Sequence, residues 1–214
     1  MQNTIVVQII KEDHLKEAAF LRSLSSERGF YSRMHWRFWE NLFRRLLHCP
    51  NAIFLAAYDK KNNKVAGFVI ATVRFKETKK TFKNRNFVAQ IAGYLALMFI
   101  KCPTKLVDAF LFSFGTNQAD LMPDQRWLTW VVHPDYRNKG VGTLLYSKLC
   151  QSMNESGVQK FYGSVDCKNT ASNKAHEKFG ARKVSTIMVE NLPHYVWEHD
   201  SENGRLLGLP HEYS

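Results

Sequence analysis

Between residues 131 and 145 the sequence reads Val131-Val132-His133-Pro134-Asp135-Tyr136-Arg137-Asn138-Lys139-Gly140-Val141-Gly142-Thr143-Leu144-Leu145. An apolar run ends at His-Pro, and apolar residues return at helical spacing from Val141, which predicts a strand, a basic turn and a helix. The first N–H groups of a helix lack backbone partners, and glycines there let an anion approach the main chain. The stretch is therefore either an ordinary strand-to-helix turn or a site for a phosphate or pyrophosphate.

The turn resembles the acyl-CoA-binding motif of the GNAT superfamily of N-acetyltransferases, Arg/Gln-x-x-Gly-x-Gly/Ala after a strand that ends in His-Pro-x-Tyr-Arg. Arg137, Gly140 and Gly142 match its three defining positions. The resemblance implies acetyl-CoA as co-substrate, with its pyrophosphate held by the backbone amides of residues 132–143. The pattern lacks the third glycine of a dinucleotide fingerprint and the Gly-Lys-Ser/Thr of a P-loop.

A second block, residues 169–181, resembles the family's downstream motif, roughly Asn-x-x-Ala-x-x-x-Tyr-x-x-Leu-Gly-Phe. Asn169, Ser172, Phe179 and Gly180 fit that frame, whereas His176 stands where the family often has tyrosine. The resemblance extends over about residues 126–190. By this resemblance the CoA-binding residues are Val131, Val132, Arg137, Asn138, Lys139, Gly140, Val141, Gly142, Thr143, Asn169, Ser172 and Lys178.

Composition is that of a folded enzyme. The 214 residues can bury a sizeable core, and a hydrophobic content of 45% excludes a disordered chain. The four cysteines form no C-x-x-C pair and follow no signal peptide, which predicts reduced thiols, a cytoplasmic location and no metal site. We expect one GNAT-like domain over residues 1–200 and a C-terminal tail over 201–214.

The order of predicted elements is also that of the GNAT family. We expect strands over 4–10, 52–58, 65–75, 126–132, 161–165 and 184–190. Helices are expected from about residue 13 and over 31–48, 141–155 and 171–179. The predicted fold class is α/β (α+β), with a mixed, mostly antiparallel central sheet flanked by helices.

A helical insert is expected over about 76–124, where the family commonly has a short turn. Its apolar runs, 87–100 and 106–114, are too short to span a bilayer. Three interpretations remain: a pair of helices packed on the domain, a contact with a second subunit, or a site for a membrane surface or a lipid substrate. Residues 74–105 carry +7 of the chain's net charge of +11. That charge suits peripheral association with an anionic membrane surface, a phosphorylated substrate or an acyl carrier protein. The alternative is a solvated basic face without a partner. Nucleic acid is disfavoured because no aromatic residues interleave with the basic ones.

Acyl transfer to an amine needs a base, donors for the thioester oxygen and a proton for the thiolate. His176 is the candidate general acid, the alternative being that it only fills space. The strand before the turn lacks a carboxylate, so Asp124 and Glu40 are candidate bases by exclusion, and Thr129 is a candidate for positioning water or substrate. A missing base favours an acceptor with a low amine pKa, such as an amino sugar.

Three functions remain open at this point. The first is an acetyl-CoA-dependent N-acetyltransferase acting on a small-molecule amine, such as an amino sugar or polysaccharide precursor. The second is an N-acyltransferase that takes longer acyl groups from CoA or a carrier protein, with the insert as acyl or membrane-contact site. The third is a non-catalytic acyl-CoA-binding domain. A homodimer is compatible with all three.

Overall fold

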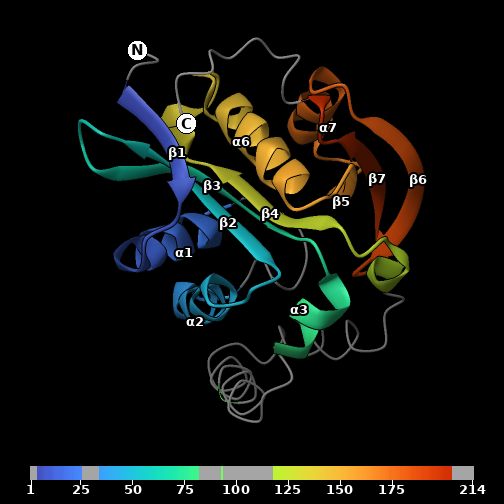
Figure 1. Ribbon diagram of the computed structural model, residues 1–214, viewed down its shortest axis with the longest axis horizontal. Helices are drawn as coiled ribbons and strands as arrows, with labels where there is room; N and C mark the ends of the chain where they lie inside the picture. Colours follow the sequence, from blue (N-terminus) through green and yellow to red (C-terminus); the bar gives the residue numbers. More distant parts are fainter. Residues whose placement is uncertain (1–3, 26–33, 82–92, 94–117, 204–214) are drawn as a thin grey trace.

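The computed structural model describes residues 4–25, 34–81, 93 and 118–203 (Figure 1). Seven strands form one sheet in the order β1-β2-β3-β4-β5-β7-β6. Every neighbouring pair is antiparallel except β4 and β5, which are parallel. The elements are β1 (Ile5–Ile9), η2 (Glu12–His14), α1 (Leu15–Ser23), α2 (Trp36–Leu47), β2 (Ala52–Asp59), β3 (Lys64–Thr72), α3 (Phe75–Thr81), η4 (Gln118–Leu121), β4 (Arg126–Val132), η5 (Pro134–Tyr136), α6 (Val141–Glu155), β5 (Lys160–Asp166), α7 (Thr170–Lys178), β6 (Arg182–Val189) and β7 (Leu192–Asp200).

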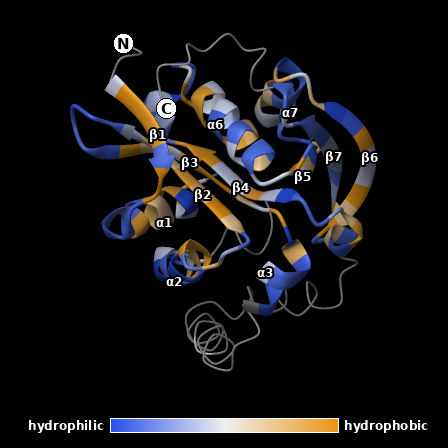
Figure 2. Ribbon diagram, in the orientation of Figure 1, coloured by the Kyte–Doolittle hydropathy of each residue, from blue (hydrophilic) through white to orange (hydrophobic). Residues whose placement is uncertain are grey.

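Helices cover both faces of the central strands, because α1 and α2 lie on one side of the sheet while α6 and α7 lie on the other (Figure 1). Alternate residues of β2 and β3 therefore enter two different cores. Phe54, Phe68 and Ile70 pack with α1 and α2, whereas Leu55 and Val69 pack with α6. In Figure 2 the central strands are mainly hydrophobic while the β2–β3 turn is hydrophilic, as expected for a sheet between two helical layers.

The predicted fold class is confirmed, and so are most of the predicted elements. Two expectations were wrong. Phe75 begins helix α3 instead of extending β3, which ends at Thr72. Strand β7 was not predicted, because the turn before it consists of Glu190 and Asn191, both with positive φ (52° and 59°), and contains no glycine. Two-residue hairpin turns are usually recognised by an Asn-Gly or Asp-Gly pair.

Of the predicted insert, the structure describes residue 93 and the two ends, which contain α3 and η4. Buried Arg126 joins them. Its guanidinium donates to the carbonyls of Pro123 (2.7 Å), Ala119 (2.6 Å) and Met122, and lies 4.0 Å from the ring centre of Phe75. Apart from residue 93, the predicted helices at 87–100 and 106–114 fall outside the described residues, as does any membrane or carrier-protein contact made there.

Within the described ranges no helix is both long and apolar enough to cross a membrane. The described cysteines, Cys49, Cys150 and Cys167, are free thiols.

Candidate functional site

The turn between β4 and α6 has the backbone geometry of an anion site. Asn138 and Gly140 adopt positive φ (60° and 84°), and α6 begins at Val141. The amide of Leu144 makes the first helical hydrogen bond, 3.0 Å to the carbonyl of Gly140. The N–H groups of residues 141–143 therefore point out of the helix end without helical partners, where the dipole favours negative charge.

The two glycines of the turn serve different purposes. Gly140 needs its left-handed φ, which side chains with a Cβ rarely adopt. Gly142 is an ordinary helical residue, and a Cβ built on it would meet only Val132 Cγ2, at 4.0 Å. Packing thus leaves room for a side chain at 142. The open space lies beside the unpaired N–H groups, which fits a ligand that approaches the main chain there.

A hydrogen bond anchors the turn to the β2–β3 hairpin. The Tyr136 hydroxyl donates to Asp59 Oδ2 at 2.7 Å, and the amide of Lys61 donates to Asp59 Oδ1 at 3.0 Å. The Tyr136 bond is the main reason that the pKa of Asp59 lies below its ordinary value. Neither Tyr136 nor Asp59 was predicted as a site residue, although Tyr136 belongs to the His-Pro-x-Tyr-Arg stretch.

Beyond the turn, β4 and β5 leave an opening in the sheet. The strands are in register only at Arg126 and Tyr162, and β4 carries an extra residue, Leu128, opposite β3. Among the described residues, the β4 edge after Arg126 therefore has no sheet partner on the β5 side. Because the strands are parallel, the opening in the strand pairing runs from Trp127 toward the end of β4, where the turn into α6 begins.

Helix α7 begins at the end of the opening that is nearer the turn. Its cap is Asn169, whose side chain accepts from the amide of Ser172 at 3.1 Å. Lys178 lies in the last turn of this nine-residue helix, about 12 Å along the axis from the first. The structure therefore separates Lys178 from Asn169 and Ser172, which the sequence analysis had grouped together.

Asn173 is a structural residue that the sequence analysis missed. Its amide nitrogen donates to the carbonyl of Asp166 (3.1 Å), and its amide oxygen accepts from Trp197 Nε1 (3.0 Å). Asn173 thereby holds α7 against β5 and β7. The asparagine alone, without its partners, gave no signal of this role.

His176 lies in an aromatic cluster under α7. The ring is 3% exposed and stacks on Trp127, with centroids 5.2 Å apart and an interplanar angle of 9°. Trp130, Trp197 and His199 surround the rest of it. Burial lowers the pKa of His176 to about 4, so the imidazole is neutral at pH 7. An imidazolium that donates a proton, as the general-acid hypothesis requires, is strongly disfavoured here, and the surroundings favour a packing role.

The other catalytic candidates do not gather around His176. Thr129 pairs with Ile70 and faces the α1–α2 core, while Trp127 and His176 lie on the α6 side of the sheet. The buried hydroxyl of Thr129 has no hydrogen-bond partner among the described residues. Asp124 accepts from the amide of Lys76 at 3.2 Å and so caps the start of α3.

Glu40 forms an ion pair with Arg44 at 3.5 Å. Within the described residues no group of three or more His, Cys, Asp or Glu side chains is arranged to hold a metal ion.

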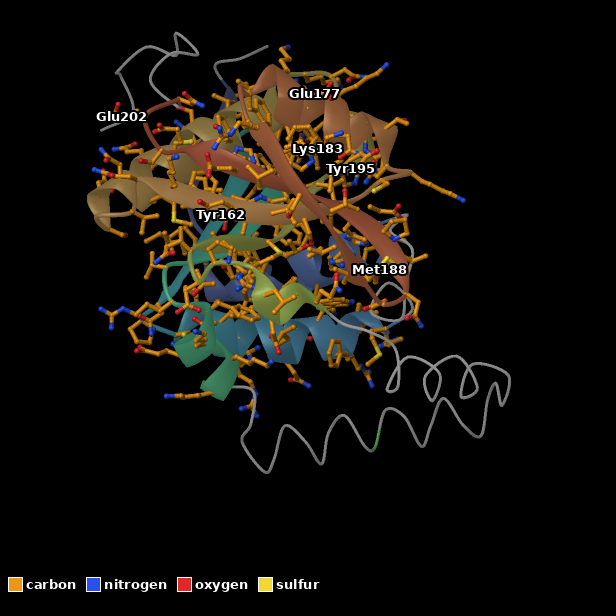
Figure 3. The ribbon with its side chains drawn as sticks, turned by 90° about the vertical axis from the view of Figure 1, so that its right-hand side faces the viewer. Tyr162, Glu177, Lys183, Met188, Tyr195 and Glu202 are labelled. Atoms are coloured by element: carbon orange, nitrogen blue, oxygen red, sulfur yellow. The ribbon has the colours of Figure 1, made fainter. Side chains whose placement is uncertain are left out.

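On the face of β5, β6 and β7 opposite α7 lies an open apolar hollow of about 240 Å³, lined by Leu121, Met122, Pro123, Tyr162, Val184, Ser185, Ile187 and Val196. Figure 3 views the molecule from this side and shows Tyr162 low on the face, below Lys183 and Tyr195. The Tyr162 hydroxyl donates to Glu198 at 2.9 Å, and Lys160 and Arg182 pair with the same carboxylate.

Burial alone would raise the pKa of Glu198, but these hydrogen bonds and charges outweigh it, and the pKa is lowered. The carboxylate is therefore committed to ion pairs within the protein.

Comparison with known proteins agrees with this geometry. Residues 108–181 match the model of the acetyltransferase (GNAT) family, and this range includes the whole turn between β4 and α6 as well as α7. No curated protein sequence matches the chain significantly.

Several solved structures share the fold at low sequence identity. The ribosomal-protein-S18-alanine N-acetyltransferase from Escherichia coli has a TM-score of 0.56 and 13% identity, over 92% of this chain and 93% of that one. A variant of spermidine N-acetyltransferase from Vibrio cholerae has a TM-score of 0.57 and 10% identity, over 94% and 96%. FdhC, described as a nucleotide-linked sugar GNAT, has a TM-score of 0.59 and 11% identity, over 95% and 90%.

Proposed function

We propose that this chain, an N-acetyltransferase of the acetyltransferase (GNAT) family, transfers an acetyl group from acetyl-CoA to the primary amine of a small molecule. One observation carries the donor assignment. The turn of residues 138–143 presents unpaired N–H groups beside an unfilled space at Gly142. That arrangement suits a pyrophosphate, which is the anionic part of CoA.

The residues predicted to bind CoA fall into groups that differ in the kind of contact they can make with it. Val141, Gly142 and Thr143 supply backbone donors at the helix start, and the exposed side chains of Arg137 and Lys139 supply positive charge. Val131 and Val132 belong to the unpaired edge of β4, which can exchange backbone hydrogen bonds with the amides of an extended ligand. Asn169 and Ser172 form the cap of α7, and Lys178 is too far along that helix to join them.

The bound acyl-CoA supplies an activated carbonyl carbon. The acceptor nitrogen bonds to that carbon, the carbon–sulfur bond breaks, the amine loses a proton and the thiolate gains one. This chain's residues contribute chiefly by holding the donor along β4 and shielding it under α7. Neutral His176 does not serve as a cationic acid, and both Asp124 and Glu40 already have partners.

The absence of a free carboxylate among these candidates favours an acceptor whose amine is already substantially neutral near pH 7. An amino sugar or a related polysaccharide precursor meets this requirement better than a lysine side chain. The fold of FdhC, described as a nucleotide-linked sugar GNAT, is compatible with the same acceptor class.

Titration of the full chain with acetyl-CoA and with free CoA tests the donor site. Gly142→Asp should weaken acetyl-CoA binding more than about tenfold, because it sets a negative charge against the pyrophosphate. Gln151→Glu adds the same charge at an exposed position farther along α6 and should leave the affinity within about twofold. Normal binding by a folded Gly142→Asp variant would show that the turn is not the phosphate site.

The acceptor is tested separately by following thiol release from acetyl-CoA with a panel of amines. We expect turnover with amino sugars or their nucleotide-linked forms to exceed turnover with polyamines and with peptides. A clear preference for peptides or polyamines would refute the acceptor class and leave the donor assignment intact.

A further inference from the structure

The opening between β4 and β5 is closed at its narrow end by the side chain of Trp127. Arg126 and Tyr162 are the last residues in register, and Trp127 and Gly163 each follow directly after them. A Cβ built on Gly163 would lie 1.8–2.3 Å from the Trp127 indole. The indole therefore occupies the space that a side chain at 163 would take, and it fills the point where the two strands begin to separate.

The indole is fixed from several sides. His176 stacks on it in parallel at 5.2 Å, and Trp130 meets it edge-on at 6.4 Å. His176 is in turn packed against Trp197. Because Gly163 lies on another side, the ring cannot turn away without displacing buried aromatic neighbours. Trp127 is thus a rigid wall.

The length of β4 places this wall at the reactive end of a bound donor. From Val132, next to the anion-binding turn, to Trp127 the strand spans about 17 Å at the usual rise per residue. The pantetheine arm of CoA has about twelve bonds in its chain, which is the reach of four extended residues, or about 14 Å. An arm that starts at the turn and follows β4 therefore brings its sulfur close to Leu128, and the acyl group beyond it meets the indole.

We infer that Trp127 determines donor specificity, by leaving room for an acetyl group and excluding longer acyl chains. This inference rests on the proposed function, and it decides between acetyl and longer acyl donors at the same site. Trp127 acts by its shape and its fixed position.

Binding of acetyl-CoA, butyryl-CoA and hexanoyl-CoA, measured by calorimetry, tests the inference independently of turnover. The wild-type chain should bind acetyl-CoA at least about tenfold more tightly than hexanoyl-CoA, since even one methylene in an apolar pocket is worth about 10–200-fold. Trp127→Ala should remove that preference, mainly by tightening the binding of hexanoyl-CoA. Trp39→Ala is the matched control, because Trp39 is an equally large ring that packs with Phe38 and Phe43 in the core on the other side of the sheet. It should keep the wild-type order.

Trp127→Phe provides a second test in case the alanine variant does not fold. Phenylalanine keeps a ring stacked on His176, but the ring is smaller than the indole and leaves more room for the acyl group. It should bring butyryl-CoA to about the affinity of acetyl-CoA. An unchanged order of affinities in a folded Trp127 variant would overturn the inference, as would wild-type protein that binds hexanoyl-CoA as tightly as acetyl-CoA. Free CoA that binds normally in those cases would leave the proposed function standing. Failure of the wild type to bind any CoA compound would overturn both.

Discussion

Replacing His176 with phenylalanine should make the protein more resistant to acid. The imidazole is 3% exposed, its Nδ1 has no hydrogen-bond partner among the described residues, and burial lowers its pKa from 6.5 to about 4. The neighbouring His199 is also buried. The pKa of His199 is lowered mainly by this burial and, to a smaller extent, by the nearby His176. The folded state therefore binds fewer protons than the unfolded chain between pH 6.5 and about 4.

The sign of the effect follows from this difference. With a folded pKa below the unfolded one, the contribution is complete above pH 6.5 and is lost as pH falls toward 4. One pKa unit corresponds to about 1.4 kcal/mol, so His176 alone should lower the free energy of unfolding by about 2 kcal/mol at pH 5 and about 3 kcal/mol at pH 4. These are large fractions of the 5–15 kcal/mol typical of a folded domain.

Urea unfolding of the wild type and of His176→Phe at pH 7.5 and 5.0 measures the effect. Phenylalanine keeps an aromatic ring against Trp127 and removes the titrating group, so the wild type should lose about 2 kcal/mol more than the variant between the two pH values. Parallel losses in both proteins would refute the buried neutral histidine. The same variant tests the general-acid hypothesis, because turnover that falls while acetyl-CoA affinity is unchanged would return His176 to the mechanism.

Four further substitutions address the supports of the site. Arg126→Met should destabilise the protein by about 3–5 kcal/mol in urea unfolding, because it removes the buried guanidinium that donates to the carbonyls at 119, 122 and 123. A loss below 1 kcal/mol would contradict that role. Asn173→Leu should cost about 1–3 kcal/mol by leaving Trp197 Nε1 unpaired, and a neutral result in the same assay would show that water replaces the amide. Gly140→Ala should lower the free energy of unfolding by about 1 kcal/mol, because residue 140 has a positive φ. Gly142→Ala should leave the stability unchanged or raise it, but should still weaken acetyl-CoA binding. Equal effects of the two substitutions on binding and on stability would contradict the separate roles of these glycines.

Local patterns predicted most of the elements because they are set by neighbouring residues. The apolar run that ends at Val132 gave β4, and the helical spacing from Val141 gave α6. Strand β7 was missed because it is partly polar and its hairpin turn contains no glycine. Its residues are buried by α7 and β5 after folding, which no local pattern records.

The sequence by itself determined where a donor site is predicted. Backbone amides at a helix start and glycines at fixed spacing are local features, and Arg137–Gly142 contains nearly all of them. It did not determine what surrounds the thioester end, because that depends on residues far apart in the chain. Only the tertiary structure brought Trp127, Gly163 and His176 together, removed the charge from His176 by burial and separated Thr129 onto the other face of the sheet. Electrostatics and shape at a site depend on long-range packing. The sequence could therefore predict a phosphate site, whereas only the fold shows which side chains lie at the proposed acyl end.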